Sequence, residues 1–256
     1  MQIATWNVNS LKVRLPHVLD WLQQTGCDVL GLQELKLDNA ANDKLVAEFA
    51  AIGYNFIYNG QKTYNGVALI SKFPLENVVL DIPEYDDVQK RVIAATVNSV
   101  RVICAYFVNG ESLISDKYQY KLAWLAQLEG YIQRELQHYP ELVLLGDYNI
   151  APEPRDTYDA AIWEGGVLCS EPERAAFNNL VALGLTDSFR HFNQEDRQYT
   201  WWDYRNMAFR RKQGLRIDHL LVSRQLIERA EACVIDPAPR KLERPSDHTP
   251  VILTLK

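Results

Sequence analysis

The sequence predicts an α/β fold in which two packed, mixed β-sheets are flanked by helices, that is, a four-layered α/β sandwich. Short apolar segments with strand character are mixed with segments of helical periodicity, without the regular spacing of repeated βαβ units. This order favours two packed sheets over one parallel sheet. The chain has 256 residues, of which 47% are hydrophobic, and no low-complexity or linker segment interrupts it. Residues 1–256 are therefore expected to form one domain around one large core.

The first predicted strand covers residues 3–6, which places Asn7 at a strand end. Asn9 or Ser10 can cap the helix that follows. The apolar stripe of this helix consists of Leu15, Val18, Leu19 and Leu22. A strand followed directly by an amphipathic helix is typical of an α/β fold.

Residues 29–34 form a short apolar strand that carries the polar pair Gln33 and Glu34 at its C-terminal end. In α/β proteins, sites are built at such ends. Further strands are expected at residues 67–70, 92–97 and 100–108. The last of them ends at Asn109-Gly110, which is a turn signal.

A long helix should follow, because apolar residues recur at helical spacing from Trp124 to Ile132. It should end before Pro140. Residues 142–145 then form a buried strand that ends in the polar segment 146–149. The second half of the chain thus repeats the arrangement of residues 29–34.

Ser170 and Glu173 form a capping box, which predicts a helix that runs until Gly184. Later strands are expected at residues 199–202, 215–223 and 250–255. These elements complete the two expected sheets.

The formal net charge of −6 argues mildly against a protein that coats nucleic acid, since phosphate binding usually leaves a basic signature. A basic stretch nevertheless lies between residues 205 and 224, where six basic residues face a single acid, Asp218. The six are Arg205, Arg210, Arg211, Lys212, Arg216 and Arg224. This stretch is either a local positive face or a solvated loop.

No apolar run approaches the roughly 18 to 20 residues that cross a bilayer. The N-terminus lacks a basic segment followed by an apolar stretch and a cleavage site, so a cytoplasmic location without membrane contact is expected. The four cysteines are widely spaced and form no zinc-binding pattern. They are expected to be reduced, mostly buried thiols.

Polar groups end apolar strands or lie beside turns at four places: Asn7, Gln33-Glu34, Asp147 with Asn149, and Asp247-His248. A buried strand end is a costly place for a carboxylate unless a cation compensates it. Mg²⁺ typically uses one or two carboxylates and keeps several waters, which suits Glu34 with Asp247 or Asp147 nearby. Each acid taken alone is also compatible with a surface residue or a salt-bridge partner.

Asp218 lies inside an otherwise apolar strand segment and needs a partner there. His248 is the first candidate, because a buried carboxylate orients an imidazole and raises its affinity for a proton. His219 is the competing partner. Alternation along a strand points His219 to the opposite face, so a structural role is expected for it.

Four segments resemble the exonuclease III family of the endonuclease/exonuclease/phosphatase superfamily: TWNVN (5–9), GLQE (31–34), GDYN (146–149) and SDH (246–248). Similar segments occur in DNase I-like nucleases, inositol polyphosphate phosphatases and sphingomyelinases, so they indicate metal-dependent phosphoester cleavage in general. Narrower likenesses to the DNA-repair branch lie at residues 64–68, 90–93, 105–111, 185–190, 199–205 and 214–218. The matches span nearly the whole chain in family order.

The resemblance implies how a water and a metal ion are held during phosphodiester hydrolysis. By similarity, Glu34 binds Mg²⁺, for which Mn²⁺ is a plausible substitute, with help from Asp247 and Asn7. Asp147, held by Asn149, orients or deprotonates the attacking water. The number of metal ions stays open.

The resemblance also implies which groups contact the phosphate. His248, paired with Asp218, binds a phosphoryl oxygen as a cation. Tyr106 donates to the phosphate or assists near the leaving group. Asn109 and Arg91 are expected to support the substrate, although Arg91 is equally compatible with a structural ion pair.

An enzyme that acts at a missing base needs a pocket for a flipped-out sugar. The resemblance implies an apolar pocket formed by Trp201, Leu215 and Ile217, which are otherwise simply core side chains. Family members often carry an aromatic residue at the position of Leu215. Residues 156–169 match the family poorly, and this segment can change the balance between incision at abasic sites and trimming of 3′ ends.

The expected activity is that of a hydrolase acting on double-stranded DNA in base excision repair. It would cut 5′ to abasic sites, remove 3′ blocking groups and 3′ nucleotides, or do both. One alternative is a specialised 3′-5′ exonuclease or 3′-phosphodiesterase with little action at abasic sites. Others are a superfamily phosphatase and an inactive binding protein; the last predicts a lost metal or water-activating group, and none is missing. Nothing in the sequence requires more than a monomer.

Overall fold

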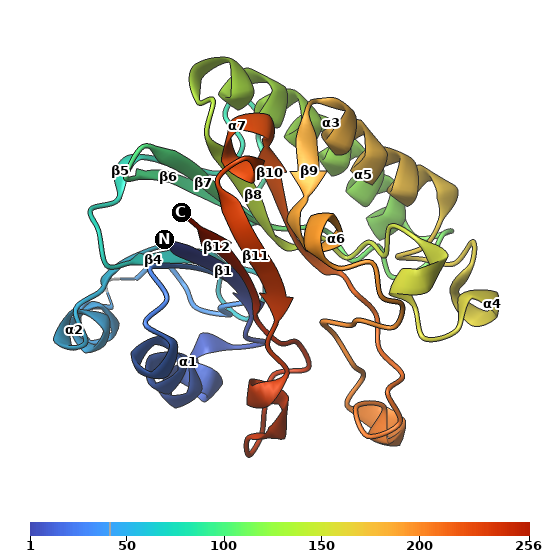
Figure 1. Cartoon of the computed structure of the whole chain (residues 1–256), viewed down its shortest axis with the longest axis horizontal. Coiled ribbons are helices and arrows are strands. Elements are labelled where there is room, and N and C mark those ends of the chain that lie inside the picture. The colour runs from blue at the N-terminus through green and yellow to red at the C-terminus, as the bar shows by residue number, and fades with distance from the viewer. Residues whose placement is uncertain (41) are drawn as a thin grey trace.

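Two β-sheets form the centre of the computed structural model, which describes residues 1–40 and 42–256 (Figure 1). The strands of one sheet are β1 (Gln2–Asn7), β2 (Val29–Gln33), β3 (Asn55–Asn59), β4 (Val67–Ser71), β11 (Ala230–Ile235) and β12 (Val251–Leu255). Those of the other are β5 (Glu76–Leu80), β6 (Val92–Val97), β7 (Val100–Tyr106), β8 (Leu142–Asp147), β9 (Leu185–Asp187) and β10 (Asp218–Ser223).

The strand order is β11-β12-β1-β2-β4-β3 in the first sheet and β5-β6-β7-β8-β10-β9 in the second. Each sheet contains one parallel pair, β1 with β2 and β7 with β8, while the other pairs are antiparallel. Both sheets are therefore mixed, as the sequence predicts.

Helices surround the two sheets. They are α1 (Leu11–Thr25), α2 (Asp43–Ala51), α3 (Asp116–His138), α4 (Ala160–Trp163), α5 (Glu171–Ala182), α6 (Ser188–Phe192) and α7 (Arg224–Ile227), with 3₁₀ turns at Pro154–Asp156, Arg205–Met207 and Ala238–Lys241. Helices α1 and α2 lie against the first sheet, and α3 and α5 against the second (Figure 1). The predicted four-layered sandwich is confirmed. In the described residues, no helix has both the length and the apolar character of a membrane span.

Local sequence signals set several helix ends. The Ser115 side chain accepts a hydrogen bond from the backbone N–H of Tyr118 at the start of α3. Glu173 accepts one from the backbone N–H of Ser170 at 3.0 Å, which completes the predicted capping box of α5. Ser10 occupies the cap position of α1, but its side chain makes no capping hydrogen bond.

The inner faces of the two sheets share one apolar cluster, to which β1, β2, β4, β6, β7, β8, β10 and β12 contribute. The sheets approach closely at Gly31 of β2. A Cβ atom at this position would lie 2.2 Å from Leu145 Cδ1 and 3.1 Å from Cys104 Sγ, which are both on the opposite sheet. The absence of a side chain at residue 31 therefore sets the local separation of the sheets.

The segment before β10 differs from the prediction. Residues 199–202 form no strand but only isolated bridges at Trp201, and the strand expected from residue 215 begins at Asp218. The Thr200 hydroxyl accepts hydrogen bonds from the backbone N–H groups of Ile217 and Asp218, both at 3.0 Å. A side chain thus takes the place of a strand ladder there. The sequence patterns do not predict helices α2, α4, α6 and α7 or strands β3, β5, β9 and β11.

The basic stretch divides into two parts. Buried Arg216 pairs with Asp156 and Asp187 at 2.7 and 2.8 Å, so it is structural. Arg210, Arg211 and Lys212 are exposed on a segment that projects from the sheets, in orange in Figure 1. Exposed Arg205 lies on the same segment and pairs with Asp203 at 2.7 Å, whereas exposed Arg224 begins α7, so the exposed basic cluster consists of Arg210, Arg211 and Lys212.

Candidate active site

The ends of five strands meet at one edge of the sandwich. In the second sheet, the register pairs Tyr106 of β7 with Asp147 of β8, and Asp147 with Asp218 of β10. In the first sheet, Asn7 ends β1, and Glu34 directly follows the parallel neighbour β2. Strand pairing thus gathers polar side chains from distant parts of the sequence.

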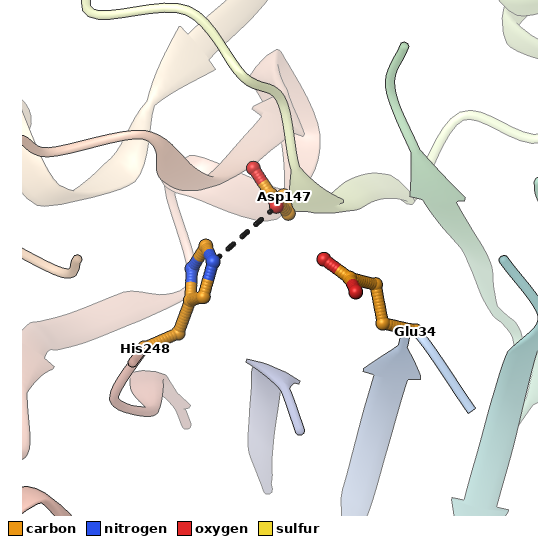
Figure 2. Close-up of side chains that lie close together, drawn as sticks. All are labelled: Glu34, Asp147 and His248. Atoms are coloured by element: carbon orange, nitrogen blue, oxygen red, sulfur yellow. Dashed lines mark ion pairs between the residues drawn. The ribbon is translucent and has the colours of Figure 1, made fainter. Parts of the chain in front are cut away.

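Glu34, Asp147 and His248 form the centre of this edge and point toward one another (Figure 2). One potential ligand atom from each lies within 4.8 Å of the others. Asn7 Nδ2 donates to Glu34 Oε1 and to Asp147 Oδ2, both at 2.9 Å, and the Tyr106 hydroxyl donates to Glu34 Oε1 at 3.0 Å. Burial, together with the charges of Glu34 and Asp147, raises the pKa of Tyr106 well above its ordinary value, so the phenol remains a donor.

Asp147 is buried, and its Oδ1 accepts a hydrogen bond from the backbone N–H of Asn149 at 2.9 Å. Burial raises the pKa of Asp147 to about 7, against the opposing effect of the His248 charge. A carboxyl group with this pKa suits proton transfer at neutral pH. Asn149 itself has a left-handed backbone, with φ of 49°, which asparagine tolerates better than most residues.

His248 and Asp218 form a buried pair. Asp218 Oδ2 lies 2.8 Å from His248 Nδ1, while His248 Nε2 lies 3.6 Å from Asp147 Oδ2. Burial alone lowers the pKa of His248, but the charges of Asp218 and Asp147 outweigh it and raise that pKa to about 10. The ring is therefore a cation at neutral pH. The competing residue, His219, contacts the Ile150 carbonyl instead, and burial lowers its pKa to about 4.

A cavity of about 700 Å³ adjoins the cluster on the side of Tyr106. Asn109 lines it, and its Nδ2 donates to Asn149 Oδ1 at 3.0 Å. Arg91 also lines it, with its guanidinium 4.9 Å from the centre of the Tyr106 ring. The hydrogen bonds of Arg91 go to Gln89 and to the Tyr106 carbonyl, which are uncharged groups.

Asp247 lies beside the central cluster rather than within it. Its Oδ1 accepts from Asn9 Nδ2 and its Oδ2 from Trp201 Nε1, both at 3.0 Å. Burial raises the pKa of Asp247, but the His248 charge and these two hydrogen bonds lower it by more, so the group is ionised. It contributes negative charge to the edge.

The three residues expected to form a sugar pocket belong to an apolar cluster with Leu168, Cys169 and Ala151. Leu215 is 0% exposed and Ile217 is 2% exposed. Trp201 is only partly buried and packs against the same cluster. Leu215 and Ile217 are thus core side chains in this structure, covered in part by the poorly matching segment 156–169.

Two polar residues at the site were not anticipated. Lys36 Nζ lies 3.1 Å from Glu34 Oε2 and donates to Asn9 Oδ1 at 2.6 Å. Lys121 is fully buried beneath Asn149 and donates to its carbonyl at 2.7 Å. A signal was available for Lys121, because it replaces an apolar residue in the buried stripe of α3, between Tyr118 and Trp124.

The donor set fits a hard divalent cation. Glu34 and Asp147 supply carboxylate oxygens at one place, which is the ligand type that such ions prefer. With Asp218 and the adjacent Asp247 there are four acids at the edge, whereas His248 and Lys36 are the basic partners within 4.0 Å of them among the described residues. A bound cation would offset the remaining negative charge.

The His248–Asp218 pair predicts how stability changes with pH. In chelator, the unfolding temperature should fall as the pH rises from about 7 to about 10. The folded-state pKa of His248, about 10, lies above its ordinary 6.5, so the stabilisation is complete below pH 6.5 and is lost as the pH rises through 10. Asp147 titrates in a lower window, between 3.8 and about 7. Asp218→Asn should flatten the decline above pH 7 in a thermal melt; equal slopes in both proteins would contradict the pairing.

Comparisons with known proteins agree with this geometry. The model of the Endonuclease/Exonuclease/phosphatase family matches residues 4–248. The exodeoxyribonuclease III of Haemophilus influenzae is 35% identical to this chain, over 98% of the chain and 98% of its own length.

Solved structures extend the likeness to the whole chain. The 3′ phosphatase NExo from Neisseria, bound to a product DNA hairpin, is 48% identical with a TM-score of 0.97, covering 100% of this chain and 99% of that one. An AP endonuclease from Archaeoglobus fulgidus is 36% identical with a TM-score of 0.95, over 100% and 99% of the two chains. The resemblance seen in the sequence is confirmed: the chain belongs to the endonuclease/exonuclease/phosphatase family and, within it, to the exodeoxyribonuclease III group.

Proposed function

We propose that the chain is a DNA-repair phosphodiesterase of the exonuclease III type, a hydrolase that cuts the DNA backbone. The observation that carries the proposal is the meeting of Glu34, Asp147 and the Asp218–His248 pair at one edge. Phosphodiester hydrolysis needs an activated water, charge neutralisation at the phosphoryl oxygens and stabilisation of the leaving oxygen. The names of the relatives supply the substrate class, DNA.

Asp147 is the proposed general base. The backbone N–H of Asn149 and the amide of Asn7 fix its two oxygens, so the carboxylate is oriented before substrate arrives. Its pKa of about 7 allows it to accept a proton from water at neutral pH. Asn149 is in turn held by Asn109.

His248 is the proposed cation for a phosphoryl oxygen. Asp218 holds the ring through Nδ1, which leaves Nε2 on the side of Asp147. Tyr106 is a proposed donor near the leaving oxygen, since its phenol stays protonated beside Glu34. Asn109 and Arg91, in the adjoining cavity, would support the strand.

Members of this family depend on a metal ion. We propose Mg²⁺, with Mn²⁺ as a substitute, held by Glu34 with Asn7 and Asp247 in support. The bound ion would polarise the phosphate and neutralise charge that develops on it. Asn7 donates hydrogen bonds to both Glu34 and Asp147, so it fixes the position of the proposed metal ligand relative to the proposed base.

The proposed substrate is double-stranded DNA with abasic sites or blocked 3′ ends, bound by a monomer. The projecting basic residues Arg210, Arg211 and Lys212 are suited to the phosphate backbone. They would supply a local positive charge for binding DNA in a chain whose net charge is −6.

One observation favours the narrower alternative, a 3′-end processing enzyme with little incision at abasic sites. Leu215 and Ile217 are closed off in an apolar cluster, so a flipped-out sugar would have to displace packed side chains. The open cavity lies instead on the side of Tyr106. We therefore propose that 3′ ends are the preferred substrates.

Three duplexes test this proposal: one with an abasic site, one with a nick carrying a 3′-phosphate, and one with an undamaged recessed 3′ end. With Mg²⁺, the 3′-phosphate should be removed fastest and the abasic site cut slowest; with chelator, all three should remain intact. An Asp147→Asn preparation controls for contaminating nucleases. Equal or faster cutting at the abasic site would refute the preference, and inertness toward all three would refute the function.

A further inference from the structure

A buried ion pair lies directly beneath the site. Lys121 of α3 and Glu173 of α5 are both 0% exposed at their side chains, and Lys121 Nζ bonds to Glu173 Oε1. Burying such a pair costs desolvation free energy, and an apolar pair of similar volume is often as stable. Stability alone therefore does not account for two charges at this position. The other hydrogen bonds of Lys121 and Glu173 indicate what else the pair does.

Lys121 bonds to the backbone of two loops. Besides Glu173, its ammonium donates to the Asn149 carbonyl at 2.7 Å and to the Asn109 carbonyl at 3.2 Å. All three N–H donors of the ammonium are thereby used. One side chain thus ties together the loop after β7 and the loop after β8.

These two loops carry residues assigned to the reaction above. Asn109 Nδ2 donates to Asn149 Oδ1 at 3.0 Å, and the backbone N–H of Asn149 donates to Asp147 Oδ1 at 2.9 Å. A continuous chain of hydrogen bonds therefore leads from Lys121 to the proposed base. A shift of the Asn149 backbone would change the direction of the Asp147 carboxylate.

Glu173 fixes a third segment. Its oxygens accept from the backbone N–H groups of Leu168 and Ser170, both at 3.0 Å, and from the Ser170 hydroxyl at 2.6 Å. Leu168 has a left-handed backbone, with φ of 73°, which is unusual for leucine and needs external support. The Leu168 carbonyl in turn accepts from the backbone N–H of Ala151 at 2.8 Å, two residues beyond Asn149.

We infer that Lys121 and Glu173 are positioning residues that hold the Asn109, Asn149 and 166–170 loops in the arrangement the reaction requires. Neither touches the substrate. The inference rests on the phosphodiesterase activity proposed above, because the orientation of Asp147 matters only if Asp147 acts on a bound water. Loss of the pair should therefore lower kcat much more than it raises KM.

The test compares Lys121→Met with Arg101→Met, using the 3′-phosphate duplex and saturating Mg²⁺. Arg101 is a matched control: it is 1% exposed, pairs with Glu135, and lies at the opposite end of β7 from Tyr106. Lys121→Met should lower kcat roughly 100-fold with KM nearly unchanged, as expected for a small displacement of a catalytic group. Arg101→Met should lose thermal stability but keep its kcat.

Amide hydrogen exchange gives a second readout, which does not need the metal. In Lys121→Met, exchange should accelerate at residues 107–111, 147–151 and 166–170 and not in the rest of the second sheet. Uniform acceleration across the sheet, or a kcat equal to that of Arg101→Met, would overturn the inference. Wild-type protein that cuts no duplex would instead refute the proposed function.

A double variant, Lys121→Met with Glu173→Leu, covers the case in which the single variant does not fold. It removes both charges, so no unpaired ion stays buried. A folded double variant should still show the loss in kcat, and wild-type kcat would overturn the inference. If neither variant folds, the pair maintains the fold as a whole rather than the site, and this result also overturns the inference.

Discussion

Asp147→Asn is expected to lower kcat by roughly 10³-fold, because a neutral amide cannot accept the proton of the attacking water. The fold should be kept, since asparagine preserves the size of the side chain and retains an oxygen for the backbone N–H of Asn149. DNA should bind as tightly as before or more tightly, because one negative charge facing the phosphate is removed. Single-turnover rates at saturating Mg²⁺, together with DNA-binding titrations, measure both quantities.

Asp28→Asn is the matched control for this substitution. Asp28 lies just before β2, at the end of the strand away from Glu34, where it pairs with Lys72 at 3.1 Å. The same chemical change there should leave kcat unaltered. A wild-type rate in Asp147→Asn would remove Asp147 from the mechanism, whereas equal losses in both variants would point to damage of the fold.

His248→Gln is expected to lower kcat by roughly 10²- to 10³-fold, because it removes a buried cation from the proposed phosphate site. Glutamine keeps an N–H donor but carries no charge, so the variant isolates the electrostatic part of the contribution. The loss of kcat should be largest at pH 6 and should shrink toward pH 8, because the His248 charge lowers the pKa of Asp147 and its removal leaves less of that carboxyl group ionised. The wild-type ring itself stays charged throughout this range, since the pKa of His248 lies near 10. Rates over this pH range provide the measurement.

Asp218→Asn tests how the charge on His248 is maintained. At low pH, Asp218→Asn should lose less kcat than His248→Gln. Its loss should grow as the pH rises, because Asp218 is the charge that most raises the pKa of His248, and without it the ring loses its proton at a lower pH. Since the two residues act as a unit, the double variant should be about as slow as His248→Gln alone. Strictly additive losses, or full activity of Asp218→Asn at pH 8, would contradict the pairing.

Sequence patterns were sufficient for the fold class and for the main site segments. Apolar strands that end in polar residues are local signals, and Glu34 and Asp147 stand at such ends in the structure. Asp218, which the pattern places inside a strand, is instead the first residue of β10. The pairing of Asp218 with His248 was also predictable, because a buried acid needs a partner and the pleat turns His219 away. Family resemblance supplied what these patterns lack, namely the reaction and the substrate class.

The unpredicted features depend on contacts between distant segments. The strand expected at residues 199–202 is absent because the Thr200 hydroxyl accepts the hydrogen bonds of the Ile217 and Asp218 backbone N–H groups. Strand propensities do not predict such a contact between a side chain and the backbone. The burial of Leu215 and Ile217 depends on how residues 156–169 fold over them. The position of Lys121 in the apolar stripe of α3 indicates burial, but the carbonyl groups that it binds belong to two loops whose placement the helix pattern does not give.

The missing side chain at Gly31 has a consequence for catalysis. Glu34 follows a strand of one sheet and Asp147 ends a strand of the other, so the distance between the proposed metal ligand and the proposed base depends on the separation of the two sheets. Glycine at residue 31, opposite Leu145, sets the thickness of the layer between them. A methyl group at residue 31 would push the two sheets apart. It would thereby increase the distance between Glu34 and Asp147 without altering either side chain.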